Sequence, residues 1–168
     1  MIVLGLGSNL SDRLHYLRKA YKAIEKISFL KVVRASPLYR SDALLPDQAP
    51  AAWDMPYLNL ALLCTTTLSP FELLDQIKNI EDTLGRKFEE KWGPRVIDID
   101  LLAFDDLVIK DKKLILPHAQ LHKRPFAIWP FADVAPFLDF SYKRNFPREM
   151  CRRNSGFFWF TFFRNGFV

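Results

Sequence analysis

The sequence predicts an α+β fold of ferredoxin-like sandwich type, in which helices pack on an antiparallel sheet. The first observation is the order of hydrophobic periodicities along the chain, which is strand, helix, strand, strand, helix, strand. The second is that both helical segments begin with capping residues. The third is size, because 168 residues with 49% hydrophobic content can form one sizeable core but not two of ordinary size.

The first strand and the first helix are predicted at the N-terminus. Residues 2–7 form a short apolar run that ends in Gly7. Ser11 or Asp12 can cap the amphipathic helix that follows. The spacing predicts that this helix buries Leu14, Leu17, Ala20, Ile24 and Ile27.

Two further strands are predicted on either side of a long loop. Residues 32–39 and 57–67 are rich in β-branched and apolar side chains. The stretch between them contains Pro46, Pro50 and Pro56, which are incompatible with regular structure.

The second helix has a strong start signal. Ser69 is the expected cap, Pro70 suits the first helical position, and Gly85 provides a stop. This helix is expected to bury Phe71, Leu74, Ile77, Ile80 and Leu84. Residues 96–104 then alternate as a strand should, and a hairpin over residues 107–116 follows.

Charge and cysteine usage narrow the class of protein. The formal net charge of +5 suits a polyanionic partner, which can be nucleic acid, an anionic membrane or a phosphorylated small molecule. The two cysteines, Cys64 and Cys151, form no disulfide framework and no paired metal-ligand spacing, which indicates a reducing compartment. The N-terminus lacks the features of a secretory signal, and no segment approaches the roughly 20 apolar residues that span a bilayer. We expect a cytoplasmic protein.

Asp98 and Asp100 are the sharpest chemical signal in the chain. In a strand both side chains leave the same face, about 7 Å apart at their bases. Two like charges on one face repel each other unless a cation or a basic group lies between them. Magnesium is the natural occupant, because it takes carboxylate oxygens together with waters and substrate phosphates. The alternative is a solvated strand face that nearby lysines neutralise.

The flanking residues favour a nucleoside triphosphate. Arginine binds phosphate oxygens with a planar fork, and aromatic rings can stack on a planar ligand. Each flanking residue alone is more often a surface charge or a core aromatic, so the hypothesis depends on their combination. The basic residues are Arg86, Lys87, Lys91, Arg95 and Arg124, and the aromatic ones are Trp92 and Phe126.

Several familiar nucleotide and metal signatures are absent from the sequence. The run from Gly5 to Leu10 has two glycines of a dinucleotide fingerprint but lacks the third, and no P-loop motif occurs. His118 and His122 have the spacing of a zinc helix, but Ala119 stands where the catalytic glutamate would be. We therefore expect ATP to bind without a phosphate loop, and we do not expect zinc.

With these residues in view, the chain resembles the 6-hydroxymethyl-7,8-dihydropterin pyrophosphokinases over roughly residues 1 to 138. These enzymes move a diphosphate from ATP to a pterin alcohol in folate biosynthesis and release AMP. The motifs that carry the resemblance are Gly7-Ser8-Asn9-Leu10, Tyr39-Arg40-Ser41, Tyr57-Leu58-Asn59, Glu81 with Gly85-Arg86, the run from Trp92 to Leu102, and Leu116-Pro117-His118 followed by Arg124 and Phe126.

The resemblance implies a role for each matching residue. Asp98 and Asp100 would hold two magnesium ions that bridge the ATP phosphates. Residues expected to act in catalysis are Arg86, Trp92, Arg95, Asp98 and Asp100, with Trp92 and Arg86 on a mobile closing loop. Nucleotide contacts are expected from Arg95, His118 and Arg124, and an adenosine site from Leu74, Lys78, Glu81, Leu101, Leu114 and Ile115. The pterin would contact Tyr57, Phe126, Asn59, Trp92, Ser41, Asp42 and Leu44.

The chain also departs from the family pattern. Phe88 and Lys91 stand where the closing loop commonly carries arginines, which predicts weaker closure or turnover. The loop over residues 42–56 resembles the form fused to dihydropteroate synthase, so that enzyme is an expected neighbour. Residues 139–168 match nothing recognisable, and a truncation or a frame-shift scar would explain this aromatic-rich tail.

Two other classes of function share features with this sequence. An RNA-binding module would also be basic, and residues 155–160 faintly resemble its aromatic strand, but they lie at the wrong place in the chain and lack the basic residue before the glycine. In the other alternative, the aromatic tail docks on a partner or a membrane beside an inactive domain. We expect ATP and the pterin as partners, with neither nucleic acid nor membrane.

Overall fold

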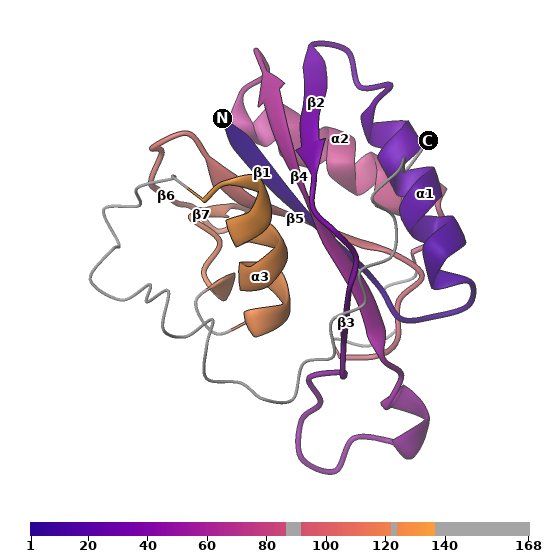
Figure 1. Ribbon diagram of the computed structural model, residues 1–168. Coiled ribbons are helices and arrows are strands. Elements are labelled where there is room, and N and C mark those ends of the chain that lie inside the picture. Colours follow the sequence, from indigo (N-terminus) through magenta and orange to yellow (C-terminus); the bar gives the residue numbers. More distant parts are fainter. Residues whose placement is uncertain (87–91, 122–123, 137–168) are drawn as a thin grey trace.

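An antiparallel sheet organises the chain, and the computed structural model describes residues 1–86, 92–121 and 124–136 (Figure 1). The strands are β1 (Ile2–Ser8), β2 (Leu30–Ala35), β3 (Tyr39–Ser41), β4 (Tyr57–Thr66) and β5 (Asp98–Phe104). Their order is β2-β4-β1-β5, and β3 pairs with β4 as well. The sheet confirms the predicted α+β fold with an antiparallel sheet.

Two helices cover one face of the sheet and supply most of the core. They are α1 (Arg13–Ile24) and α2 (Pro70–Thr83), and both begin at a capped residue. The Asp12 side chain accepts a hydrogen bond from the His15 N–H at 3.0 Å, while Ser69 and Glu72 form a reciprocal capping box. Between the two possible caps of the first helix, the chain therefore uses the aspartate.

The buried stripe of α2 differs from the predicted one. Leu73, Ile77 and Glu81 are fully buried at four-residue spacing, whereas Phe71 is 41% exposed, so the predicted burial of Phe71 was wrong. Phe71 precedes Leu73 by two residues, which places it on the far side of the helix. The helix ends as expected before Gly85, whose φ of +87° suits a residue without a side chain.

The strand predicted over residues 32–39 is broken into β2 and β3. Pro37 has no N–H to donate, and Ser36 instead bridges the gap: its N–H donates to the Ala61 carbonyl at 2.9 Å, and its hydroxyl accepts from the Ala61 N–H at 2.9 Å. Both pieces stay paired with β4. The strand predicted over residues 96–104 is β5, and it begins at Asp98 rather than at residue 96.

Helix α3 (Pro125–Val134) was not predicted, and it packs on the face of the sheet opposite α1 and α2 (Figure 1). It is apolar on almost every side and contains Pro130, so it shows no helical periodicity to read. Ile128, Phe131 and Val134 close a second, smaller core with strand residues such as Val3 and Leu102. Helix α3 therefore adds a layer that the predicted order of elements did not contain.

Shorter elements complete the described chain. A 3₁₀ turn, η1 (Ala51–Trp53), lies in the long loop before β4. The predicted hairpin is present as β6 (Ile109–Lys110) and β7 (Ile115–Leu116). Among the residues that the structure describes, no helix has both the length and the apolar character needed to cross a bilayer.

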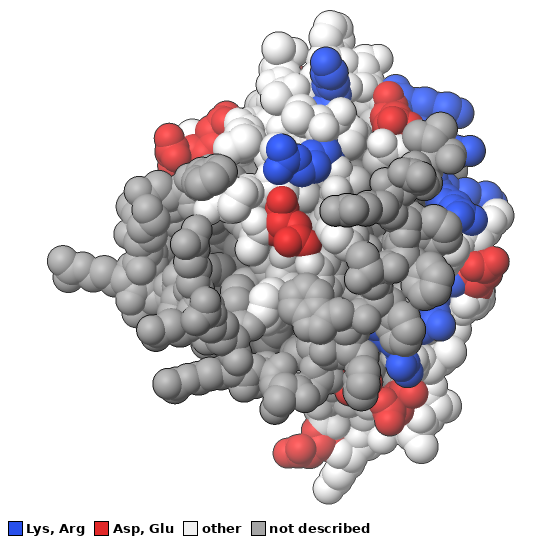
Figure 2. Space-filling view, in the orientation of Figure 1, with Lys and Arg blue, Asp and Glu red and all other residues white. Residues whose placement is uncertain are grey.

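The positive charge of the chain is partly displayed on α1. Arg18, Lys19 and Lys22 are exposed there, and lysine and arginine side chains gather along the side of the molecule where α1 lies (Figure 2). A basic helix face of this kind is the ordinary solvated side of an amphipathic helix, and it selects no partner by itself.

Candidate active site

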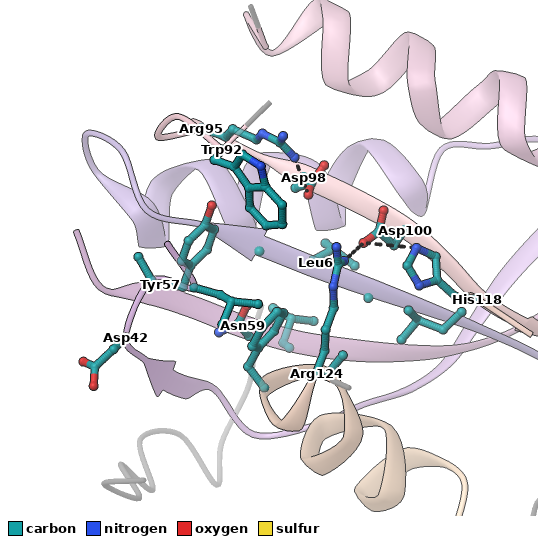
Figure 3. Close-up of a pocket in the computed structure, with 18 of the residues that line it drawn as sticks. Leu6, Asp42, Tyr57, Asn59, Trp92, Arg95, Asp98, Asp100, His118 and Arg124 are labelled. Atoms are coloured by element: carbon teal, nitrogen blue, oxygen red, sulfur yellow. Dashed lines mark hydrogen bonds and ion pairs between the residues drawn. The ribbon is translucent and has the colours of Figure 1, made fainter. Parts of the chain in front are cut away.

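A cavity of about 230 Å³ opens on the sheet face that carries α3 (Figure 3). It is lined by β1, β4 and β5, by the loop after β3, by the segment before β5 and by the start of α3. Sites expected from the sequence that line it are Asp42, Leu44, Tyr57, Asn59, Trp92, Arg95, Asp98, Asp100, His118, Arg124 and Phe126. Segments far apart in the chain therefore converge here.

The strand register explains why the two aspartates share this cavity. Asp98 lies opposite Gly7 of β1, and Asp100 lies opposite Gly5. Because side chains two positions apart leave the same face of a strand, both carboxylates point toward the cavity, as the sequence predicted (Figure 3).

Two arginines flank Asp98. Arg86 Nη2 lies 2.8 Å from Asp98 Oδ1, and Arg95 Nη1 lies 3.0 Å from Asp98 Oδ2. Burial disfavours the charged form, but the charges of Arg86 and Arg95 outweigh it and hold the pKa of Asp98 below its usual range. Asp98 is therefore a carboxylate at neutral pH.

Asp100 has a different environment. Its Oδ2 lies 3.5 Å from Arg124 Nη1 and 4.0 Å from His118 Nε2. Burial, and after it the negative charge of Asp98, raise the pKa of Asp100. Burial also lowers the pKa of His118, so at neutral pH the His118 ring is uncharged and its contact with Asp100 is not an ion pair.

Glu81 anchors the arginine behind Asp98. Its carboxylate is fully buried and forms ion pairs with Arg86 and, at 2.9 Å, with Lys78 Nζ. It also accepts a hydrogen bond from the Ile99 N–H, which ties α2 to the strand that carries the aspartates. A buried carboxylate with three donors is well compensated, and it fixes the position of Arg86.

The wall of the cavity that faces the two aspartates carries aromatic rings and one side-chain amide. Tyr57 and Asn59 project from β4, and Phe126 lies at the start of α3 with the Arg124 guanidinium 5.9 Å from its ring centre. Ser41 does not line the cavity, but its hydroxyl accepts a hydrogen bond from Asn59 Nδ2 at 3.0 Å. This bond fixes the Asn59 amide, which leaves its oxygen facing Gly7.

Some predicted residues lie elsewhere. The Asp42 side chain points away from Tyr57 although its backbone borders the cavity (Figure 3). Leu74, Leu101 and Leu114 pack in or against the core under α1 and α2, and Ile115 is 47% exposed on β7. Together with Lys78 and Glu81, these residues do not line the cavity. Lys87, Phe88, Lys91, His122, Cys151 and the tail lie outside the described residues.

Asn9 is a structural member of the site to which the sequence gave no role. Its Oδ1 accepts a hydrogen bond from the Arg95 N–H at 2.7 Å, and its Nδ2 donates to the Met55 carbonyl at 3.2 Å. Asn9 thereby joins the segment that carries Arg95 to the loop that leads into Tyr57. The sequence signals were its place in the Gly7-Ser8-Asn9-Leu10 motif and its position directly after β1, where a short polar side chain can bond to nearby backbone.

The fold and this cavity define an α+β protein whose cavity has a carboxylate pair on one side and aromatic side chains on the other, as small-molecule sites commonly combine a few polar groups with an apolar wall. The chain belongs to the 7,8-dihydro-6-hydroxymethylpterin-pyrophosphokinase family, whose model matches residues 3–136. The resemblance seen in the sequence is thus confirmed.

Individual relatives agree with this membership. A 2-amino-4-hydroxy-6-hydroxymethyldihydropteridine pyrophosphokinase of Aquifex aeolicus is 41% identical over 139 residues, which cover 80% of this chain and 80% of that protein. A folate synthesis bifunctional protein of Chlamydia muridarum is 39% identical over 138 residues, or 81% of this chain and 30% of that protein. The chain therefore spans less than a third of that bifunctional relative.

Solved structures share the fold. The crystal structure of Plasmodium falciparum HPPK-DHPS wild type aligns with a TM-score of 0.57 at 17% identity, covering 79% of this chain and 40% of that one. An HPPK-DHPS structure in complex with substrates aligns with a TM-score of 0.61 at 14% identity, covering 83% and 42%. At such identities the likeness concerns the fold alone.

Proposed function

We propose that this chain transfers a diphosphate from ATP to 6-hydroxymethyl-7,8-dihydropterin and releases AMP. The observation that carries the proposal is the placement of Asp98 and Asp100 in one cavity with Tyr57, Asn59 and Phe126 on its other wall. One wall suits a metal-bound polyphosphate, and the other suits a flat heterocycle with an amide edge. Family membership supports the same reaction.

The carboxylate pair fits magnesium. Within the described residues no three His, Cys, Asp or Glu side chains form a complete cage, which is compatible with an ion that takes one or two carboxylates and completes its shell with waters and phosphates. Burial and the negative charge of Asp98 raise the pKa of Asp100, and a bound cation would favour the ionised form of Asp100. Two bound ions would neutralise charge on the phosphates during transfer.

The basic residues of the cavity are proposed to position the triphosphate. Arg95 and Arg124 already bracket the two aspartates, and their planar guanidinium groups suit phosphate oxygens. His118, neutral at pH 7, can donate one hydrogen bond without adding charge. Arg86, held by Glu81, is proposed to act with Trp92 at the closing side of the site. The adenosine contacts remain proposed for Leu74, Lys78, Glu81, Leu101, Leu114 and Ile115.

The pterin is proposed to lie between Tyr57 and Phe126 with its amide edge on Asn59. Ser41 would act by holding the Asn59 amide, while Asp42 and Leu44 would contribute backbone contacts. The hydroxyl oxygen of the pterin substrate then attacks the β-phosphorus of ATP in line. The bond from that phosphorus to the α-phosphate oxygen breaks, and AMP leaves. The hydroxyl proton passes to the ionised Asp98 or to water.

The proposal is tested by measuring AMP release from ATP, magnesium and hydroxymethyldihydropterin. Asp98→Asn should abolish turnover while the thermal unfolding temperature stays near that of the wild type. Asp106→Asn, at an exposed turn position, is the matched control and should keep full activity. If Asp98→Asn retained most of the wild-type rate, the carboxylate assignment would be wrong.

Dihydropteroate synthase is the proposed neighbour. Support comes from the bifunctional relatives and from structural neighbours that are HPPK-DHPS chains. The same proposal treats residues 1–138 as the catalytic domain, places it in the cytoplasm, and has it act on small molecules without nucleic acid or membrane. Co-purification of the chain with a dihydropteroate synthase from the same source would test the partnership.

A further inference from the structure

We propose that Gly7 is a specificity-determining residue for the pterin, because its missing side chain leaves open the path from Asn59 on β4 to Asp98 on β5. This inference rests on the proposed function and deepens it. It concerns the floor of the cavity rather than the two walls.

The register of three strands places these residues in one row. Gly7 pairs with Asn59 on one side and with Asp98 on the other. With neighbouring strands about 4.8 Å apart, the ends of the row are about 10 Å apart. Asn59 and Asp98 accordingly lie on opposite sides of β1 (Figure 3). A pterin that hydrogen-bonds to Asn59 and accepts the diphosphate beside Asp98 therefore has to lie across β1 at Gly7.

Backbone conformation does not explain this glycine. Gly85 is the only glycine among the described residues with a positive φ, so Gly7 has a conformation that any residue can adopt. Glycine inside a strand weakens it, and it often marks a place where a ligand or another backbone approaches closely.

The surroundings of Gly7 indicate which ligand approaches. A Cβ built at this position would lie 3.1 Å from Asn59 Oδ1 and 3.5 Å from Tyr57 Cδ1. Both neighbours are residues of the proposed pterin wall, and Gly7 itself lines the cavity. A methyl group here would stand between the amide that reads the ring and the aromatic side chain that stacks on it.

Gly5 provides a contrast two positions away on the same strand face. A Cβ at Gly5 would lie 2.9 Å from Leu102 Cδ1 and 3.2 Å from its Cγ, and its three nearest atoms all belong to Leu102. Gly5 lies in the next row, between Ala61 and Asp100. Gly5 also lines the cavity and Leu102 is 2% exposed, so Gly5→Ala serves as a comparison variant whose methyl group crowds the second core rather than the proposed pterin wall.

The test compares Gly7→Ala, Gly5→Ala and the wild-type chain at full length. AMP release gives KM for hydroxymethyldihydropterin and for ATP, and calorimetry gives Kd for a non-hydrolysable ATP analogue with magnesium. Gly7→Ala should raise KM for the pterin about tenfold or more, as expected when a methyl group overfills a fitted site. The ATP values should stay within about twofold. Gly5→Ala, whose methyl group crowds Leu102 rather than the proposed pterin wall, should not raise KM for the pterin relative to KM for ATP.

Each outcome decides the question. Equal pterin KM values for Gly7→Ala and the wild type would overturn the proposal, and so would equal losses for the pterin and ATP in Gly7→Ala. A wild-type chain that folds but releases no AMP would instead reject the proposed function.

If the Gly7→Ala variant does not fold, a measurement on the wild-type chain still tests the proposal. The chain has six glycines, so glycine-selective isotope labelling gives a small set of NMR signals. With hydroxymethyldihydropterin and the ATP analogue bound, we expect a nuclear Overhauser effect between the ligand and the Gly7 α-protons. Its absence from a saturated complex would also overturn the proposal.

Discussion

At the scale of single residues, three acidic side chains show how surroundings assign roles. Glu81 is fully buried and bonds to Lys78, Arg86 and the Ile99 N–H, so it acts as an internal anchor. Asp98 and Asp100 remain open to the cavity, one bracketed by two arginines and the other by weaker contacts. Similar carboxylates thus serve as scaffold in one place and as prospective ligands in another.

The Cys64 thiol should be chemically inert in the folded chain. It is buried in the sheet, and burial raises its pKa to about 12, so the reactive thiolate is scarce at neutral pH. In a Cys151→Ser variant, which keeps Cys64 as the single thiol, Ellman's reagent should react slowly in native buffer and rapidly after denaturation in guanidinium chloride. Rapid stoichiometric reaction in native buffer would contradict the described burial.

At the scale of elements, short-range signals decide where helices begin. The capping box at Ser69 satisfies backbone groups at both ends of the first turn of α2: the Ser69 hydroxyl accepts from the Glu72 N–H at 3.3 Å, and the Glu72 carboxylate accepts from the Ser69 N–H at 2.8 Å. Hydrogen bonding of the Glu72 carboxylate to the Ser69 side chain, and after it to the Ser69 N–H, lowers the pKa of Glu72. Since α2 carries Glu81, the cap contributes to the position of the anchor behind Asp98.

Removal of this cap should weaken the fold measurably. Ser69→Ala should lower the free energy of unfolding by about 1 kcal/mol, because an N–H of the first turn loses its acceptor. Urea denaturation followed by circular dichroism gives the value. Ser28→Ala, at an exposed turn position, is the control and should change the same quantity by less than about 0.5 kcal/mol. Equal stability of the two variants would argue against the cap.

At the scale of the whole molecule, the two faces of the sheet have separate tasks. The face under α1 and α2 is filled by aliphatic side chains and holds most of the core. The other face is shared between α3, which closes a smaller core, and the cavity. Tyr39 on β3 donates a hydrogen bond to the Asp133 carboxylate, which ties α3 to the edge of the sheet.

This division predicts the result of shortening the chain. Every described core residue lies between Ile2 and Ala135, so a chain of residues 1–138 should unfold cooperatively and keep AMP release close to that of the full chain. A chain of residues 1–124 lacks α3 and exposes Val3, Leu63 and Leu102; it should lose cooperative thermal unfolding. Failure of the 1–138 chain to fold would show that the last thirty residues of the sequence are needed.

The sequence by itself determined the elements with strong local patterns. The cap at Ser69, the stop at Gly85 and the shared face of Asp98 and Asp100 all follow from short-range rules of backbone geometry and periodicity, and the same rules narrowed the first cap to Ser11 or Asp12. The family resemblance then supplied roles that no spacing rule contains.

Only the tertiary structure decided the features that depend on non-local contacts. Helix α3 has no period to read because it packs within an apolar setting, and the break at Pro37 became visible only through the bonds between Ser36 and Ala61. The row that joins Asn59, Gly7 and Asp98 is likewise a property of strand register. Register is set by pairing between segments some fifty and ninety residues apart, so no local window of the sequence could specify it.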